Sequence, residues 1–188
     1  MDAPRFLGNH FLIALPAMHD PSFSRTVTLL CQHNEEGAMG LMLNRTSEYR
    51  LGDVLEQMQI RTDDEALAAA PVLIGGPVQP ERGFVLHEPG GEEWDSTFRL
   101  SDSLSLTTSR DILAAMARGG GPKRTLIALG YAGWGEGQLE TELQDNAWLT
   151  VAADGAILFD TPLEQRWSAA ARLMGVDLTL LTDYSGHA

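Results

Sequence analysis

Short apolar runs that favour β-strands outnumber the helical segments of this sequence, and the two kinds do not alternate regularly. Regular alternation would predict a parallel sheet with helices on both faces, whereas this order is typical of the α+β class. We therefore expect a mixed and strongly curved, partly barrel-like sheet flanked by helices. The chain has 188 residues, of which 44% are hydrophobic, and this fits a single domain over residues 1–188.

The first half of the chain is expected to supply several strands and short helices. Turn residues at 34–37 separate two apolar runs and predict a hairpin. The helix expected at 51–58 has apolar residues at helical spacing, and we expect it to pack on that hairpin. The expected strands are 11–14, 26–33, 38–43, 72–74 and 83–87, and the expected helices are 51–58 and 63–70.

Turn and cap residues divide the second half. The dipeptide Asp154-Gly155 predicts a hairpin, and Thr161 followed by Pro162 predicts the start of the last helix. A helix is also expected after Thr108, because this hydroxyl residue is followed by an acid three positions later. The expected strands are 104–107, 125–129, 148–151 and 157–159, and a further helix is expected at 138–143.

The charge and cysteine content restrict the possible partners and compartment. The 26 acidic and 13 basic side chains give a formal net charge of −13, which repels phosphate backbones and disfavours direct nucleic-acid binding. The lone cysteine, Cys31, cannot form an internal disulfide and suits a reducing compartment. The apolar run at 11–15 is too short to cross a membrane, which needs about 20 residues. We therefore predict a soluble cytoplasmic protein without a membrane partner.

The segment from Leu129 to Trp148 concentrates glycine, aromatic, amide and acidic residues, and it is the segment most typical of a site. Its spaced glycines lie between an expected strand and an expected helix, where a glycine loop can hold phosphate. Glu136 and Glu140 bring negative charge to the first turn of that helix and would repel an anion. We therefore expect a structural turn that presents Tyr131 and Trp134.

Nucleophilic and metal-binding side chains are few and scattered. Cys31 and His33 are two apart on an expected strand and so should share a face, but a thiol beside leucines is expected to be buried with a raised pKa. None of the five histidines has a metal-ligand spacing, and one cysteine excludes thiolate zinc sites. A site assembled in space from His33 or His87 with Asp20 or Glu140 stays open. From spacing we predict no metal site and no cofactor.

Several blocks of the chain are more specific than any periodicity. Within the segment above they are Gly130-Tyr131-Ala132-Gly133-Trp134, Gly137-Gln138-Leu139-Glu140, Asn146 and Trp148-Leu149. Elsewhere they are Phe11-Leu12-Ile13-Ala14, Pro16, Met18, Asp20, Phe23, His33, Gly37-Ala38-Met39-Gly40, Asn44, Gly75-Gly76-Pro77-Val78, Gly83-Phe84-Val85-Leu86-His87 and Gly186-His187-Ala188. In residue type and order these blocks resemble the AlgH/YqgE family over nearly the whole chain.

The resemblance implies a bacterial cytosolic α+β protein with a single domain. Members of the family have been described as transcriptional regulators, without an established biochemical activity. The family name refers to alginate production, a role that the resemblance does not assign to this chain.

We favour a regulatory or binding module in which a pocket holds a small molecule or a polar group of a protein partner. Aromatic and amide side chains suit this role because they orient ligands without shifted pKa values. The candidate pocket residues are Asp20, His33, Asn44, His87, Tyr131, Trp134, Gln138, Glu140 and Asn146.

Three other hypotheses remain open. One is an enzyme, a hydrolase or transferase in which His33 or His87 is a base oriented by Asp20 or Glu140. Another is a DNA-binding regulator, which the acidic charge disfavours. In the last, the same residues only stabilise the fold, since aromatic rings fill cores and amides satisfy buried backbone groups. The sequence predicts neither the oligomeric state nor the identity of a ligand.

Overall fold

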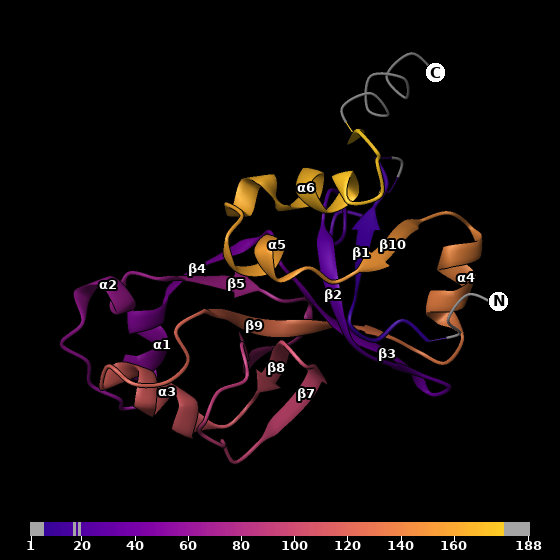
Figure 1. Cartoon of the computed structure of the whole chain (residues 1–188). Helices are drawn as coiled ribbons and strands as arrows, with labels where there is room; N and C mark the ends of the chain where they lie inside the picture. Colours follow the sequence, from indigo (N-terminus) through magenta and orange to yellow (C-terminus); the bar gives the residue numbers. More distant parts are fainter. Residues whose placement is uncertain (1–5, 17, 19, 179–188) are drawn as a thin grey trace.

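One continuous sheet forms the centre of the molecule (Figure 1). The computed structural model describes residues 6–16, 18 and 20–178. The ten strands are β1 (His10–Ala14), β2 (Val27–Asn34), β3 (Gly37–Met42), β4 (Thr46–Arg50), β5 (Pro71–Ile74), β6 (Val78–His87), β7 (Thr97–Ser101), β8 (Leu104–Thr107), β9 (Thr125–Trp134) and β10 (Trp148–Ala152). Their order is β10-β1-β2-β3-β9-β6-β8-β7, with β5 beside β9 and β4 beside β5. The β5–β9 pair is parallel and the other pairs are antiparallel, so the sheet is mixed, as predicted.

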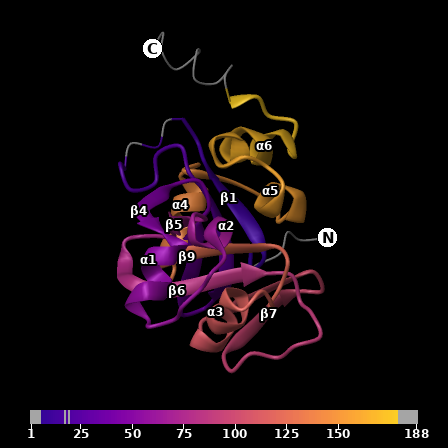
Figure 2. The same ribbon diagram turned by 90° about the vertical axis from the view of Figure 1, so that its left-hand side faces the viewer.

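Helices flank the curled sheet. They are α1 (Leu51–Gln57), α2 (Glu65–Ala68), α3 (Arg110–Ala117), α4 (Gln138–Gln144), α5 (Gly155–Phe159), the 3₁₀ helix η1 (Leu163–Gln165) and α6 (Arg166–Arg172). Figures 1 and 2 show α5 and α6 over the end that contains β1 and β2, and α1 and α3 at the opposite end. The predicted α+β class with a strongly curved sheet is confirmed. In the described ranges, no helix has the length and apolarity that a membrane span requires.

Alternating side chains on the two faces of the sheet fill three cores. In β1, Phe11 and Ile13 face an inner core that α5 and α6 cover. The intervening Leu12 faces a second core, which contains Trp134 and residues of α4. The third core joins α1 and α3 to the outer side of β5, β6 and β9. The single sheet is therefore buried on both faces over much of its area.

The two halves of the sheet meet on β9. Its first part pairs with β5 and β6, and its last part pairs with β3. We expected the strand to end at Leu129 in a turn, and this was wrong, because Gly130 takes a φ of 75° and bends the strand without ending it. Gly76 crosses this bend so closely that a Cβ would lie 2.1 Å from the carbonyl carbon of Tyr131. Glycine is therefore required at the crossing.

The structure confirms the predicted hairpin as β2 and β3 but corrects the packing of the helix that follows. We expected α1 to pack on that hairpin. Instead its buried Leu55 shares the third core with Val72 of β5 and Ile112 of α3. The reason is that β4 and β5 carry the chain to the opposite end of the sheet before and after α1.

Two expectations near the C-terminal end were also wrong. Residues 155–159 form a helix and not the second strand of a hairpin, because the side chain of Asp154 accepts a hydrogen bond from the amide of Ala156 and caps that helix. Thr161 does not cap the last helix, since its hydroxyl donates to the carbonyl of Ala156. The 3₁₀ turn η1 comes before α6 instead.

Candidate ligand-binding groove

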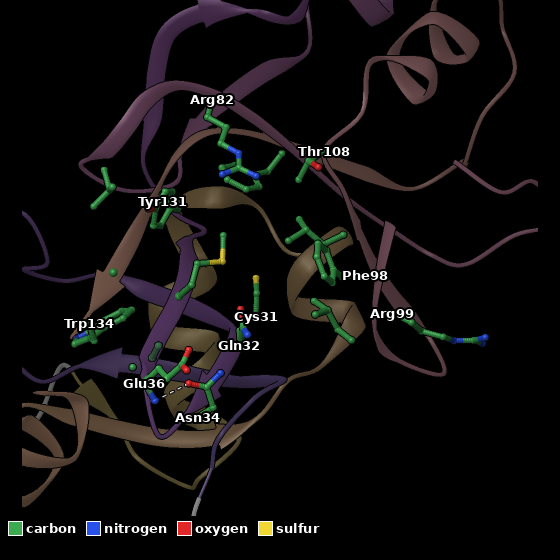
Figure 3. A pocket seen from close by; sticks show the side chains of 18 residues that line it. Cys31, Gln32, Asn34, Glu36, Arg82, Phe98, Arg99, Thr108, Tyr131 and Trp134 are labelled. Carbon is green, nitrogen blue, oxygen red and sulfur yellow. Dashed lines mark hydrogen bonds between the residues drawn. The ribbon is translucent and has the colours of Figure 1, made fainter. Parts of the chain in front are cut away.

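A groove of about 750 Å³ opens on the inner face of the sheet (Figure 3). Its walls come from the β2–β3 hairpin, β6, β7, β8 and the end of β9. Much of the lining is apolar or aromatic and includes Met39, Phe84, Phe98, Leu100, Leu106 and Tyr131. Most of these side chains belong to the inner core or pack against it, so the groove is a part of that core left open. Its volume suits a small organic molecule.

A β-bulge in β2 decides which hairpin side chains face the groove. The two neighbours of Cys31 pair with consecutive residues of β3, so Cys31 is an extra residue in the strand. The extra residue reverses the alternation beyond it. Cys31 and Gln32 therefore both line the groove, whereas His33 lies on the other face against Leu7 and α4. The expectation that Cys31 and His33 share a face was wrong for this reason.

The thiol of Cys31 adds an uncharged group to the groove. Burial raises its pKa from 9.0 to about 12, as the neighbouring leucines led us to expect. The thiol donates a long hydrogen bond to the carbonyl of Leu29, at 3.7 Å. Since the thiolate is the nucleophilic form, Cys31 is a poor nucleophile at neutral pH.

Arg82 is a cation at the groove (Figure 3). The pairing between β6 and β9 jumps from Val78 to Gly83, and the residues between them, Arg82 included, leave the regular ladder. The guanidinium carbon of Arg82 lies 5.3 Å from the centre of the Phe84 ring, a cation–π distance. Among the described residues it has no hydrogen bond or ion pair.

His33 and Glu140, two of the predicted site residues, form a pair outside the groove. His33 Nε2 lies 2.5 Å from Glu140 Oε1, and the amide of Leu7 donates to His33 Nδ1 at 2.9 Å. Because an amide N–H can only donate, Nδ1 carries no proton and Nε2–H donates to the carboxylate. The His33 side chain is 1% exposed. Both ring nitrogens are therefore occupied by the protein itself.

His87 is buried at the other end of the sheet. Its Nδ1–H donates to the carbonyl of Glu88, and its Nε2 lies 2.7 Å from the hydroxyl of Thr107. His87 pairs with Thr125 at the start of β9, whereas Trp134 ends that strand. At roughly 3.3 Å per residue, the two positions are up to about 30 Å apart along the strand. The structure therefore does not bring His87 to the other predicted site residues.

The carboxylate of Glu142 organises Trp134, Gln138 and Trp148. The indole N–H groups of Trp134 and Trp148 donate to its Oε1 at 3.2 and 3.0 Å, and the amide of Gln138 donates to its Oε2 at 3.1 Å. The ring of Phe23 lies 6.0 and 5.6 Å from the two tryptophan rings. These contacts join β9, α4, β10 and the loop before β2, which is a role in the fold.

The remaining predicted residues shape the backbone. Asp20 accepts an amide hydrogen bond inside its own loop. Asn44 accepts from the amide of Val27 at 3.0 Å and donates to the carbonyl of Arg25 at 2.8 Å. Asn146 follows α4 with a φ of 58°, the left-handed conformation that ends helices and that asparagine tolerates.

Of the nine predicted pocket residues, Tyr131 and Trp134 line the groove. Sequence reasoning missed Arg82, Phe98 and Met39 as site residues. Phe98 carried the one usable signal, since it is an aromatic residue among polar neighbours, and it is 65% exposed. Among the residues that the structure describes, no three His, Cys, Asp or Glu side chains are grouped to hold a metal ion. His19 and His187 lie outside the described residues.

Comparisons with known proteins find relatives that match nearly the whole chain. A UPF0301 protein of Xanthomonas campestris pv. campestris (strain B100) is 60% identical over 185 residues, which is 98% of each chain. A UPF0301 protein of Methylococcus capsulatus is 57% identical over 97% of this chain and 96% of its own.

Solved structures and a family profile agree with these relatives. The solution structure of the AlgH protein from Pseudomonas aeruginosa matches with a TM-score of 0.80 and 54% identity, over 97% of this chain and 96% of that one. An X-ray structure of a protein from Corynebacterium diphtheriae, at 22% identity and a TM-score of 0.74 over 97% and 94%, shares the fold. The profile described as AlgH-like matches residues 11–179. The chain therefore belongs to the AlgH-like family, whose relatives named above are UPF0301 proteins.

Proposed function

We propose that this chain is a cytoplasmic regulatory or binding module whose ligand site is the groove on the inner face of the sheet. One observation carries the proposal. A cavity of about 750 Å³ is walled by side chains of the inner core and its margin, and several of them, Met39, Leu100 and Tyr131, are only partly buried. Covering such apolar surface is favourable by about 25 cal/mol per Å². A ligand with an apolar body would therefore gain binding free energy by burying this surface.

The enzyme hypothesis has one observation in its favour, the hydrogen bond between His33 and Glu140. A carboxylate that orients a histidine is the arrangement found in acid–base catalysis. In such a pair the second ring nitrogen meets the substrate, but here it accepts the amide of Leu7. This reaction class would therefore require residue 7 to leave His33 first, and the groove needs no such rearrangement.

Direct DNA binding has less support. The net charge is −13, and of the basic cluster Arg118, Lys123 and Arg124, the last is already paired with Glu88 and Asp160. A regulatory role through protein contacts is compatible with this charge.

The test uses N-phenyl-1-naphthylamine, a neutral probe whose fluorescence rises in apolar surroundings. We expect saturable binding to the purified protein. Phe98→Ala is expected to weaken it roughly tenfold, because removing one aromatic ring from the contact loses about 1.5 kcal/mol. Leu173→Ala is the matched control, since Leu173 is also an exposed apolar side chain, 44% exposed, but lies outside the groove. Absent binding, or equal effects of the two substitutions, would overturn the proposal.

A further inference from the structure

We infer that the groove takes an amphipathic molecule with a single carboxylate group, and that Arg82 is the counter-ion of that carboxylate. The inference rests on the proposed function, because it assumes that the groove is the ligand site. It adds the chemical class of the ligand and the residue that selects it.

Arg82 packs on an aromatic ring without using its hydrogen-bond donors. Its guanidinium lies over the Phe84 ring, with 5.3 Å between the guanidinium carbon and the ring centre. Stacking uses the face of the guanidinium and leaves the N–H groups at its edge free. In the described part of the chain no oxygen atom accepts from them. Arg82 is therefore an exposed cation at the groove, packed on Phe84 and with unused donors (Figure 3).

Two other arginines differ from Arg82 because their guanidinium N–H groups have acceptors. Arg99 borders the same groove, but its side chain points away (Figure 3) and donates to the carbonyls of Ser101 and Asp102. Arg124 stacks on an aromatic ring as Arg82 does, yet its N–H groups bind two carboxylates. Arg82 has the stacking of Arg124 without the carboxylates, and a ligand carboxylate would complete the same arrangement.

The surrounding charge favours a monoanion. Glu36 lines the groove as well, and the chain as a whole carries −13. A phosphate monoester brings nearly two negative charges and is usually held by several cations, whereas a carboxylate is matched by one guanidinium through two parallel N–H···O bonds. Thr108 lies near Arg82 in the lining (Figure 3), which also contains the apolar or aromatic side chains of Phe98, Tyr131 and Met39. This lining requires an alkyl or aromatic body behind the carboxylate.

The test compares octanoate with 1-octanol as competitors of N-phenyl-1-naphthylamine. The two molecules share an alkyl chain and differ in the charged head group. In Arg82→Gln we expect octanoate to compete roughly tenfold more weakly, since a charge-assisted hydrogen bond is lost. Competition by 1-octanol should change less than twofold. Arg118→Gln is the matched control, because Arg118 is an exposed arginine outside the groove, and it should leave both competitors as in the unsubstituted protein.

The outcomes separate this inference from the proposed function. In one outcome the neutral probe binds and Phe98→Ala weakens that binding, but octanoate displaces the probe equally well from Arg82→Gln and from the unsubstituted protein. This outcome overturns only the carboxylate inference. If the probe does not bind, the proposed function is overturned, and the inference that rests on it is overturned with it. Stronger competition by octyl phosphate than by octanoate would also overturn the inference, because it would show preference for a dianion.

Discussion

The aromatic end of β9, formed by Trp134 with Gln138, Glu142 and Trp148, differs from the groove beside it in how far its side chains are paired. At the aromatic end, the donors and acceptors of Trp134, Trp148, Gln138 and Glu142 are paired with one another. In the groove, neither Arg82 nor the exposed ring of Phe98 has such a partner within residues 6–16, 18 and 20–178. The family blocks contribute to both regions: Trp134 belongs to each, and Met39, Phe84 and Tyr131 line the groove. We therefore expect the saturated network at the aromatic end to stabilise the fold and the open side chains of the groove to serve the proposed ligand site.

This division has a physical basis. A buried polar group left without a partner costs about 1–3 kcal/mol, so a saturated network tolerates little change. An exposed apolar or charged side chain contributes little to the stability of the free protein and can contribute fully when a ligand covers it. Substitutions should therefore affect stability at the aromatic end and binding in the groove.

Gly76→Ala is expected to have the largest effect on stability. The new methyl group would lie 2.1 Å from the carbonyl carbon and 2.2 Å from the carbonyl oxygen of Tyr131, and a backbone atom cannot move aside as a side chain can. We expect a loss of about 3 kcal/mol or more, or failure to fold. Denaturant unfolding measures this loss. Gly83→Ala is the control, because nothing lies within 4 Å of a Cβ there, and similar losses would contradict the crossing as the cause.

Cys31 tests the apolar character of the groove. With a thiol pKa of about 12, alkylation by iodoacetamide at pH 8 should be roughly a thousandfold slower than for an ordinary thiol. Mass spectrometry of timed samples measures the rate. A rate close to that of the urea-unfolded protein would show that the thiol is not buried.

The same pKa predicts a pH dependence of stability with a definite sign. The folded pKa of Cys31 is raised, so the unfolded chain loses the thiol proton first as the pH rises. The stability contribution is present below the unfolded pKa, 9.0, and is lost as the pH rises toward 12. Relative to Cys31→Ala, the unsubstituted protein should therefore lose stability between about pH 8.5 and 10.5 in denaturant unfolding.

Glu142→Ala should destabilise the aromatic end without changing the groove. Its removal leaves two indole N–H groups without an acceptor, and both tryptophans are at most 5% exposed. We expect a loss of about 2–3 kcal/mol in denaturant unfolding, and a smaller loss in Glu142→Gln, which keeps one oxygen acceptor. Binding of N-phenyl-1-naphthylamine at a temperature where the variant is folded should be unchanged. A selective loss of probe binding would show that the groove depends on Trp134, which lines it and which Glu142 holds, and would contradict the separation of the two regions.

The sequence predicted the elements that have a buried apolar run, such as β1, β2, β8 and α3. It did not predict β4 and β7, because most of their residues are exposed and show no apolar periodicity. Asp154-Gly155 misled the prediction, since an aspartate can cap a helix as well as form a hairpin turn. Local patterns thus identify elements that bury a face and miss elements held by strand pairing.

The site was harder to predict than the fold because the groove is assembled from six strands, several of them far apart in the sequence. The bulge at Cys31 has no signal in the sequence, yet it decides which side of β2 faces the groove. Glu142 has no sequence signal for its structural role, although its position between Trp134 and Trp148 lets one carboxylate bind both indoles. Composition and spacing identified residues that stabilise the fold. The contacts in the structure were needed to find the groove residues whose side chains have no partner among the described residues.

Asn146 gives the smallest effect and the most direct distinction between a structural and a ligand-binding role. Its φ of 58° strains a residue with a Cβ, so Asn146→Ala should cost about 1 kcal/mol, whereas Asn146→Gly should stay within about 0.5 kcal/mol of the unsubstituted protein. Denaturant unfolding measures both. Glycine removes the amide completely, so a variant that keeps its stability and its probe binding would show that the backbone conformation explains this family residue. Weaker probe binding in Asn146→Gly alone would instead extend the ligand site to the aromatic end and break the division between the two regions.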